Sequence, residues 1–489
     1  MFTQLLKQIP YLNLIIQLSK KHNVNIWLVG GFLRDLILEK IGALSQKKFD
    51  FDFCVEGEVL SVVKEFAKLI SSKVIVLDEK EFSFRVVAKK KKLTYTYDFA
   101  KIRANTFKED LSLRDFSINT LAINLQDKDF SLIDYFGAQE DIKKRLLKVI
   151  KERVLKDDPL RILRGFSFMA NYGFRITEET KLAMIKYKTL LKKVSAERIS
   201  EELFKILISD NSHPAIKLMS DLKIIDQIIP YIKNMRGVWQ GRYHHLDVWE
   251  HSLETLKEFE RLYKNKFSKN QFLFGYLNEE LGLDKRRLLV IKLACILHDI
   301  GKPKAKRQKG KKTIFYVHEK IGKDLVEKIA DRLRFSSKIK EVLTKLVLWH
   351  LRPGYLADQI NPTKRAIYRF FRDTQSEGVG VILLSLADWR ATKGPLTDTK
   401  KRTKHERIML KIVNNYFLEA QIKPLKKIVD GYDIMRKFNL IPSPLIGKIL
   451  NKIKEEQVLG KITNKKEAYN IAKKIILKFR RDNYANRRN

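Results

Sequence analysis

The sequence predicts an α+β protein in which a small α/β head precedes an all-helical neck, body and tail. Two patterns support this fold class. Up to residue 125 the chain alternates between helical apolar spacing and short strand-like runs, whereas after about residue 141 helical periodicity continues almost to the C-terminus. The length of 489 residues favours several domains, and 44% hydrophobic residues are enough to form packed cores, which excludes a disordered chain.

The head begins with helical spacing over residues 3–21, and a short strand over Ile26–Val29 leads into a helix over Arg34–Leu38. Strand-like alternation then recurs in five further segments, which are Phe49–Val55, Lys73–Leu77, Phe82–Ala88, Leu93–Phe99 and Leu121–Leu125. Strands interspersed with helices indicate a mixed sheet with helices packed on it.

Interruptions of the helical pattern divide the rest of the chain. Pro230 and the glycine-containing stretch 236–241 mark one boundary, and Gly394-Pro395 marks another. We predict four domains: a head over 1–140, a helical neck over 141–235, a third domain over 236–400 and a basic helical tail over 401–489.

The charge of the chain indicates a polyanionic partner. Lysine and arginine number 98 against 57 acidic residues, which gives a formal net charge of +41 at pH 7, and the basic residues are spread along the sequence. Such a field attracts nucleic acid over long distances. A lysine-biased genome or a thermophilic surface is the alternative explanation.

Cysteine content and the N-terminus bear on the compartment. The two cysteines, Cys54 and Cys295, lie far apart, which excludes a disulfide framework and a cysteine-rich zinc module. No basic segment with a cleavage site opens the chain, and no window approaches about 18 uninterrupted apolar residues. We expect a soluble, cytoplasmic protein with no membrane partner.

The head carries a glycine turn followed by paired carboxylates. The strand that ends at Gly30-Gly31 opens a helix containing Arg34, and such a turn lets backbone N–H groups approach a phosphate. Asp50 and Asp52 project from one face of the next strand because side chains alternate. Two carboxylates suit Mg²⁺, and two such ions can activate an attacking hydroxyl and neutralise a leaving pyrophosphate. The pattern predicts nucleotidyl transfer, although each motif alone is also typical of an ordinary turn or edge strand.

A third carboxylate, Asp98, is expected on a later strand beside this pair. Four ordered motifs then carry a family resemblance: residues 28–35 with Asp50-x-Asp52, residues 113–122, residues 157–168 and residues 195–203. Together they resemble the class II tRNA nucleotidyltransferases and bacterial poly(A) polymerases.

The resemblance implies roles for individual positions. Gly31 and Arg34 would contact the triphosphate, and Asp50 and Asp52 would hold Mg²⁺. The implied nucleotide-binding residues are Gly30, Gly31, Arg34, Arg114, Asp115, Asn119, Asp158, Arg161 and Arg164.

Asp158 and Arg161, with Arg164 beside them, would act as a protein template. A carboxylate accepts from the exocyclic amine of C or A while a guanidinium donates to ring acceptors, so such a pair can select CTP and ATP without a nucleic-acid template. At i and i+3 on a helix, Asp158 and Arg161 are also typical of a plain surface ion pair.

The chain departs from the family pattern in three places. Leu113 stands where the family usually has arginine, and Asp157 stands where it has glutamate. The connection from Asp98 to Arg114 is short, where full CCA-adding members generally carry a longer flexible loop. Within the family a shortened loop is associated with enzymes that add only the two C residues, so CC addition is a serious sub-hypothesis.

A second set of titratable residues lies in the third domain. Imidazole and carboxylate ligands on separate helices suit a divalent transition metal, Zn²⁺, Mn²⁺, Ni²⁺, Co²⁺ or Fe²⁺. A lone histidine in such a sequence is usually structural, but six of nine histidines lie at or near these motifs. The set resembles the HD phosphohydrolase superfamily, which implies His251, His298, Asp299 and Asp388 as core ligands and His318 and His350 at a second metal position.

Four further residues flank this set. Lys302 and Arg352 could neutralise a phosphate, whereas His244 and His245 are expected to be structural or to face the substrate. By this reading a metal-bound water would attack a phosphoester.

We therefore expect a tRNA nucleotidyltransferase that adds C, with or without A, to tRNA 3′ ends from CTP and ATP, with a second, HD metal site. A bacterial poly(A) polymerase shares the head motifs but usually lacks an HD domain. An HD phosphohydrolase with an inactive RNA-binding head and a non-enzymatic RNA chaperone are rivals of other classes. The oligomeric state stays open.

Overall fold

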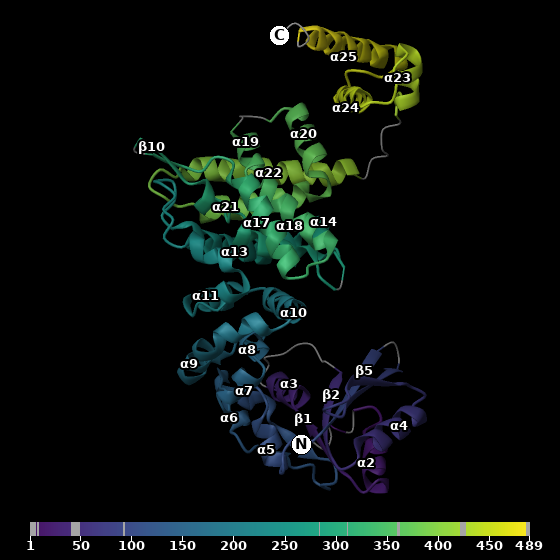
Figure 1. Ribbon diagram of the computed structural model, residues 1–489, viewed down its shortest axis with the longest axis vertical. Coiled ribbons are helices and arrows are strands. Elements are labelled where there is room, and N and C mark those ends of the chain that lie inside the picture. The colour runs from purple at the N-terminus through teal and green to yellow at the C-terminus, as the bar shows by residue number, and fades with distance from the viewer. Residues whose placement is uncertain are drawn as a thin grey trace. The chain divides into compact units, whose positions relative to one another are not determined.

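The computed structural model describes residues 6, 9–40, 49–90, 93–282, 284–310, 312–358, 362–420 and 427–485. The chain forms two compact units (Figure 1). The first consists of Met1–Lys233 with Arg332–Arg334, and the second of Asn234–Asp331 with Phe335–Asn489.

The first unit begins with a mixed sheet of seven strands in the order β3-β4-β5-β2-β1-β6-β7. The strands are β1 (Asn25–Val29), β2 (Asp50–Glu56), β3 (Val74–Asp78), β4 (Ser83–Lys90), β5 (Leu93–Lys101), β6 (Ala122–Asn124) and β7 (Leu132–Ile133). Strand β2 runs antiparallel to β1 and parallel to β5, so it lies at the centre of the sheet.

The two faces of this sheet differ in chemistry. On β2 the odd-numbered residues Phe51 and Phe53 are buried, and on β5 Tyr97 and Phe99 pack in the same layer beside Phe66 of α4. Because side chains alternate along a strand, the even-numbered, largely polar residues of β2 and β5 face the other way. One face is therefore core, and the other is free to build a site.

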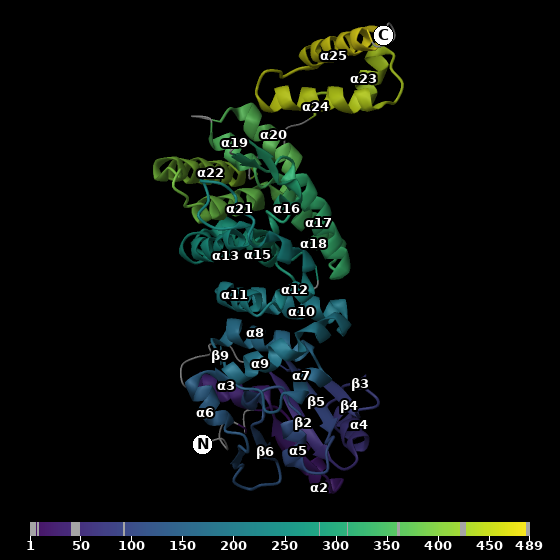
Figure 2. The same ribbon diagram turned by 60° about the vertical axis from the view of Figure 1, so that its left-hand side comes forward.

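Helices complete the unit, and α8, α10 and α11 pack side by side (Figure 2). The helices, with 3₁₀ turns marked η, are α2 (Leu12–Lys21), α3 (Gly31–Lys40), α4 (Val59–Leu69), α5 (Phe107–Ser112), η1 (Ser117–Asn119), α6 (Ala138–Lys144), α7 (Arg153–Asp157), α8 (Leu160–Tyr172), α9 (Glu178–Tyr187), η2 (Lys188–Lys193), α10 (Ala196–Leu207), α11 (His213–Asp221), α12 (Ile225–Ile228) and η3 (Pro230–Met235). Gly173 ends α8 with a φ of 71°, which is the left-handed cap that glycine favours.

The second unit is mostly helical, with α13, α15, α18 and α21 packed together at its centre. Its helices are α13 (Val248–Asn265), η4 (Phe267–Lys269), α14 (Gln271–Asn278), α15 (Arg287–Leu297), α16 (Lys302–Ala305), α17 (His318–Arg332), α18 (Ser337–Trp349), α19 (Arg352–Ala357), α20 (Lys364–Thr374), η5 (Gln375–Glu377), α21 (Gly378–Ala391), α22 (Thr399–Ala420), α23 (Gly431–Phe438), α24 (Pro444–Val458) and α25 (Lys465–Ala485). Helices α23 to α25 share an apolar cluster that includes Ile434, Ile449 and Ala468.

The fold confirms the predicted α/β head and helical body and corrects three details. Leu6 is helical, but the expected helical segment over residues 3–21 is interrupted at residues 9–11, where Tyr11 has a positive φ of 62°, and it resumes as α2; residues 3–5, 7 and 8 lie outside the described residues. Helix α4 was not expected. Strands also occur after residue 141, where none was expected. They form two short pairs, β8 (Leu146–Leu147) with β9 (Arg175–Ile176) and β10 (Arg307–Lys309) with β11 (Lys312–Ile314).

Among the described residues, no helix is both long enough and apolar enough to cross a bilayer.

Candidate functional site

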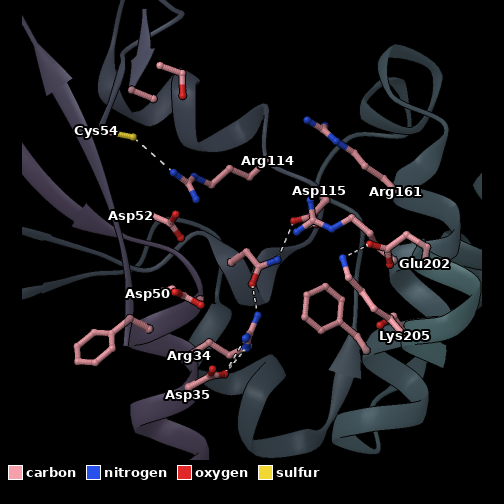
Figure 3. Close-up of a pocket in the computed structure, with 18 of the residues that line it drawn as sticks. Arg34, Asp35, Asp50, Asp52, Cys54, Arg114, Asp115, Arg161, Glu202 and Lys205 are labelled. Carbon is pink, nitrogen blue, oxygen red and sulfur yellow. Dashed lines mark hydrogen bonds and ion pairs between the residues drawn. The ribbon is translucent and has the colours of Figure 1, made fainter. Parts of the chain in front are cut away.

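The polar face of the head sheet opens into a cavity of about 1010 Å³ (Figure 3). Residues of β2 lie on one side, and Arg161, Glu202 and Lys205 from the neck helices lie on the other. The predicted site residues that line this cavity are Gly31, Arg34, Asp50, Asp52, Arg114, Asp115, Asn119, Arg161 and Arg164.

Two polar side chains approach the backbone of the glycine turn closely. Gly30 has a φ of +81°, and a Cβ at this position would lie 2.9 Å from Arg114 Nη1 and 3.2 Å from Asp52 Oδ2. The Gly30 N–H donates to the Leu121 carbonyl at 3.1 Å. Gly31 begins α3, so its amide belongs to the helix N-terminus that the sequence predicts as a phosphate contact.

Asp50 and Asp52 occupy alternate positions on β2, as predicted. Burial raises the pKa of Asp52 above its ordinary value, an effect that Arg114 opposes and that Asp98 and Asp50 reinforce. A carboxylate that is desolvated and crowded by like charge is stabilised by a cation, so the pair fits divalent metal binding.

Asp98 lies in register with Asp52 on the neighbouring strand β5. Its two carboxylate oxygens each accept a hydrogen bond of 2.7 Å from Arg85 on β4. The structure therefore brings the third carboxylate beside the pair but shows it engaged by a guanidinium. A catalytic role for Asp98 stays a prediction.

A chain of hydrogen bonds crosses the floor of the cavity. Arg34 donates to Asp35 at 2.8 Å and to Asn119 Oδ1 at 2.7 Å, and Asn119 donates to Asp115 at 2.8 Å. The other oxygen of Asp115 lies 3.1 Å from Arg164. Burial would raise the pKa of Asp115, but Arg164 and the Asn119 amide outweigh it and hold that pKa below its usual value.

The two predicted template residues have different partners. Asp158 ends α7 and pairs with Arg198 at 2.9 Å, whereas Arg161 donates to the Leu113 carbonyl at 2.8 Å. Neither side chain is therefore held by an ion pair between Asp158 and Arg161. Their role in nucleotide selection stays a prediction.

Several cavity residues were missed by the sequence analysis. Phe168 and Tyr172 of α8 each stack on the Arg34 guanidinium, with 4.9 Å between the ring centroid and Cζ. Cys54 and Asp110 also line the cavity. Strand alternation could have identified Cys54, because it follows Asp50 and Asp52 at the same two-residue spacing.

In the second unit, the predicted HD residues come together from five segments. Two groups of possible ligands, His251 with His298 and Asp299, and Asp299 with His318 and His350, each have their ligand atoms within 4.8 Å of one another. All five residues are buried.

The two oxygens of Asp299 face different histidines. Oδ2 lies 3.2 Å from His298 Nε2 and 3.9 Å from His251 Nε2, whereas Oδ1 lies 3.3 Å from His318 Nε2 and 3.6 Å from His350 Nε2. The carboxylate is thus placed to serve two adjacent ligand sets.

Asp388 on α21 completes the group. Its Oδ1 lies 2.9 Å from His251 Nε2 and 3.8 Å from His298 Nε2. Asp388 therefore adjoins the His251 and His298 side of the cluster.

Protonation states in this cluster suit cation binding. Burial lowers the pKa values of His251 and His350, which keeps their imidazoles neutral, as metal ligands must be. Burial would raise the pKa of Asp299, but His298 and Lys302 hold it well below the usual value. Burial would also lower the pKa of His298, but Asp299 outweighs it and raises that pKa. A divalent ion bound to Asp299 would take the place of the proton on His298.

The four residues expected beside the histidine and aspartate cluster differ in whether they reach it. Lys302 Nζ lies 2.6 Å from Asp299 Oδ2 and donates to Gln240 Oε1 at 2.6 Å, so it reaches the cluster. Arg352 instead pairs with Asp373 at 2.6 Å. The ring of His244 meets that of His251 edge to face with 4.7 Å between centroids, and His245 is exposed.

Four family models match successive parts of the chain. They describe a "Poly A polymerase head domain" over residues 26–148, a "Probable RNA and SrmB- binding site of polymerase A" over 173–236, an "HD domain" over 248–393 and a "tRNA nucleotidyltransferase domain 2 putative" over 396–471.

Whole-chain similarity agrees with these matches. An A-adding tRNA nucleotidyltransferase of Deinococcus radiodurans is 27% identical over 74% of this chain and 77% of its own length, and a CC-adding one of Thermus thermophilus is 27% identical over 74% and 76%. The fold resembles a Thermotoga maritima CCA-adding enzyme complexed with tRNA, with a TM-score of 0.64, 21% identity and 98% of each chain covered. The head, the neck, the HD domain and the relatives agree, and the chain belongs to the family of tRNA nucleotidyltransferases and poly(A) polymerases, in the form that carries an HD domain.

Proposed function

We propose that this chain adds nucleotides to the 3′ end of tRNA, with CTP, and ATP where A is added, as donors. The observation that supports this most directly is the cavity in which the Gly30-Gly31 turn, the Asp50 and Asp52 carboxylates and Arg114 converge. The net charge of +41 supports a polyanionic acceptor.

Mg²⁺ held by Asp50 and Asp52 would supply charge neutralisation for the attacking hydroxyl and the leaving pyrophosphate. The chain contributes the rest of the site. The Gly31 amide at the start of α3 and the Arg114 guanidinium beside Asp52 would hold the triphosphate of the incoming nucleotide.

Selection of the base would fall to the neck. Arg161 and Arg164 face the cavity, and the Asp115 carboxylate holds Arg164 at 3.1 Å. A guanidinium fixed in this way can donate to the ring acceptors of C or A, while Asp158 accepts from the exocyclic amine.

We further propose that the head adds C residues and stops before A. Strand β5 ends at Lys101 and α5 begins at Phe107, so only a short connection stands where full CCA-adding members carry a longer loop. The two relatives above are equally identical to this chain, yet one is named A-adding and the other CC-adding, so names alone do not decide between the activities.

The test is extension of a tRNA that lacks its 3′ CCA, with CTP alone, ATP alone and both, resolved at single-nucleotide length. Two added C residues, with no further A when ATP is present, are expected. Addition of a terminal A after two C residues would show a full CCA-adding enzyme. An A tract from ATP alone would support the poly(A) polymerase alternative instead.

The domain over 236–400 would form a second active site, which we propose hydrolyses phosphoesters. The two ligand sets that share Asp299 fit two adjacent ions, Zn²⁺, Mn²⁺, Ni²⁺, Co²⁺ or Fe²⁺, and these would supply an activated water. Lys302, hydrogen-bonded to Gln240 beside the cluster, would balance phosphate charge. Metal-dependent release of phosphate from 3′-phosphorylated RNA tests this site separately from the head.

A further inference from the structure

Cys54 lies in the wall of the nucleotide cavity although nothing in the motif analysis assigned it a task. On β2 it follows Asp50 and Asp52 at two-residue spacing, so all three side chains project from the same face of the sheet. Figure 3 shows its sulfur joined to Arg114 across that wall. The residue is 4% exposed.

The thiol has a hydrogen-bond partner on each side. Arg114 Nη2 donates to Cys54 Sγ at 3.4 Å, and Cys54 Sγ donates to Asp110 Oδ2 at 3.7 Å. The other oxygen of Asp110 accepts from the Arg103 backbone N–H at 2.9 Å, which fixes the carboxylate.

Arg114 needs such an anchor because of where its guanidinium lies. Nη1 lies 2.9 Å from the point that a Cβ on Gly30 would occupy, and Asp52 Oδ2 lies 3.2 Å from the same point. The Nε of Arg114 is buried and has no hydrogen-bond partner within the described ranges. The contact with Cys54 therefore helps to decide which way the charged end points.

We propose that Cys54 is a positioning residue for nucleotide transfer: its thiol, oriented by Asp110, holds the Arg114 guanidinium beside Asp52, where the incoming nucleotide binds. The inference rests on the proposed function of the head. It gives β2 a third functional position after the two carboxylates.

A packing role is the competing explanation. Cys54 also belongs to an apolar cluster with Trp27, Val29, Leu111 and Ala122. The positioning and packing explanations predict opposite orders of activity for the valine and serine variants of Cys54. Valine fills the volume but has no polar atom, whereas serine keeps a donor and an acceptor but is smaller and more polar.

The experiment compares Cys54→Val with Cys54→Ser in the full-length protein. Steady-state extension of a CCA-less tRNA gives kcat and the KM for CTP, and thermal unfolding gives stability. We expect Cys54→Val to unfold at a temperature at least as high as Cys54→Ser, yet to lose about tenfold in kcat/KM for CTP. Cys54→Ser should stay within about threefold of wild type, and the KM for tRNA should not change in either variant.

Cys295 provides the matched control, because it is the other buried cysteine and lies in α15 of the second unit. Cys295→Val and Cys295→Ser should extend tRNA equally well at a temperature at which both are folded. Equal activity of the two Cys54 variants, or greater activity of Cys54→Val, would overturn the positioning role.

Binding of CTP without RNA provides a second measurement that needs no turnover. Cys54→Ser should bind CTP more tightly than Cys54→Val, and the reverse order would contradict the inference. If the wild-type protein extends tRNA but Cys54→Ser is no better than Cys54→Val, only this inference is refuted. A wild-type protein that neither binds CTP nor extends tRNA would refute the proposed function, and the inference with it.

Discussion

Replacement of Gly30 by alanine has two expected effects, strain in the backbone and displacement of the Arg114 guanidinium, and a control variant can distinguish them. Gly30 has a φ of +81°, a conformation that costs an L-residue about 1–2 kcal/mol. The new Cβ would also lie 2.9 Å from Arg114 Nη1, which is closer than carbon and nitrogen can pack. Because that atom is the far end of a flexible side chain, the guanidinium moves away at little further cost in stability.

Gly137→Ala is the matched control. Gly137 has a similar φ of +73°, but a Cβ there would have no atom within 4 Å among the described residues. Both variants should therefore lose about 1–2 kcal/mol of unfolding free energy. Only Gly30→Ala should displace Arg114, and the loss of one charged hydrogen-bonding contact lowers kcat/KM for the nucleotide about 10- to 100-fold.

The assay is chemical unfolding of both variants together with single-nucleotide extension of tRNA at saturating and limiting CTP. Matched stabilities with an activity loss confined to Gly30→Ala support the argument. If Gly137→Ala lost as much activity, strain alone would explain the effect. If Gly30→Ala stayed fully active, Arg114 would have no part in nucleotide binding.

Three further predictions follow from the two sites. Asp52→Asn should abolish nucleotide addition and leave metal-dependent phosphatase activity, while His298→Ala should do the reverse; loss of both activities in one folded variant would contradict separate sites. Asp115→Asn should lower the unfolding free energy by about 2 kcal/mol at neutral pH. Because the pKa of Asp115 is depressed in the folded protein, that difference should be present in full above about pH 4 and disappear as the pH falls through the depressed value. If the stability difference between wild type and Asp115→Asn did not change as the pH fell below about 4, Asp115 would not be ionised in the folded protein. Finally, elemental analysis of the purified protein should find about two transition-metal ions per chain. The Asp299→Asn variant should hold fewer than one such ion, and the His350→Ala variant about one. Equal metal content in those two variants would refute a shared Asp299.

The larger elements of the fold were predictable because their signals are long and periodic. The strands around Phe51 and Tyr97 alternate over seven to nine residues, which separates core from cavity positions. Strands β8 and β9 have two residues each, too few to show alternation. The helical segment that precedes β1 is interrupted before α2 because Tyr11 adopts a left-handed conformation that no apolar pattern predicts.

The candidate sites were predictable at the level of motifs but not of partners. The sequence places Asp98 on a strand, but only the register shows it opposite Asp52 and paired with Arg85. Spacing on one helix likewise suggests that Asp158 contacts Arg161, whereas Arg198 from α10 takes its place. Contacts between residues far apart in sequence depend on tertiary packing, which local patterns do not encode.

The hydrogen-bonded chain from Asp35 to Arg164 has a consequence for redesign of the enzyme. Arg34 is held by Asp35, by Asn119 and by two aromatic rings of α8, and Asn119 in turn holds the carboxylate that fixes Arg164. If Arg164 selects the nucleotide as proposed, its substitution would remove a cation from Asp115 and so disturb the Asn119 amide that holds Arg34 in the first turn of α3. Altered-specificity variants should therefore be sought by varying Asn119 and Arg164 together, because both contact the Asp115 carboxylate.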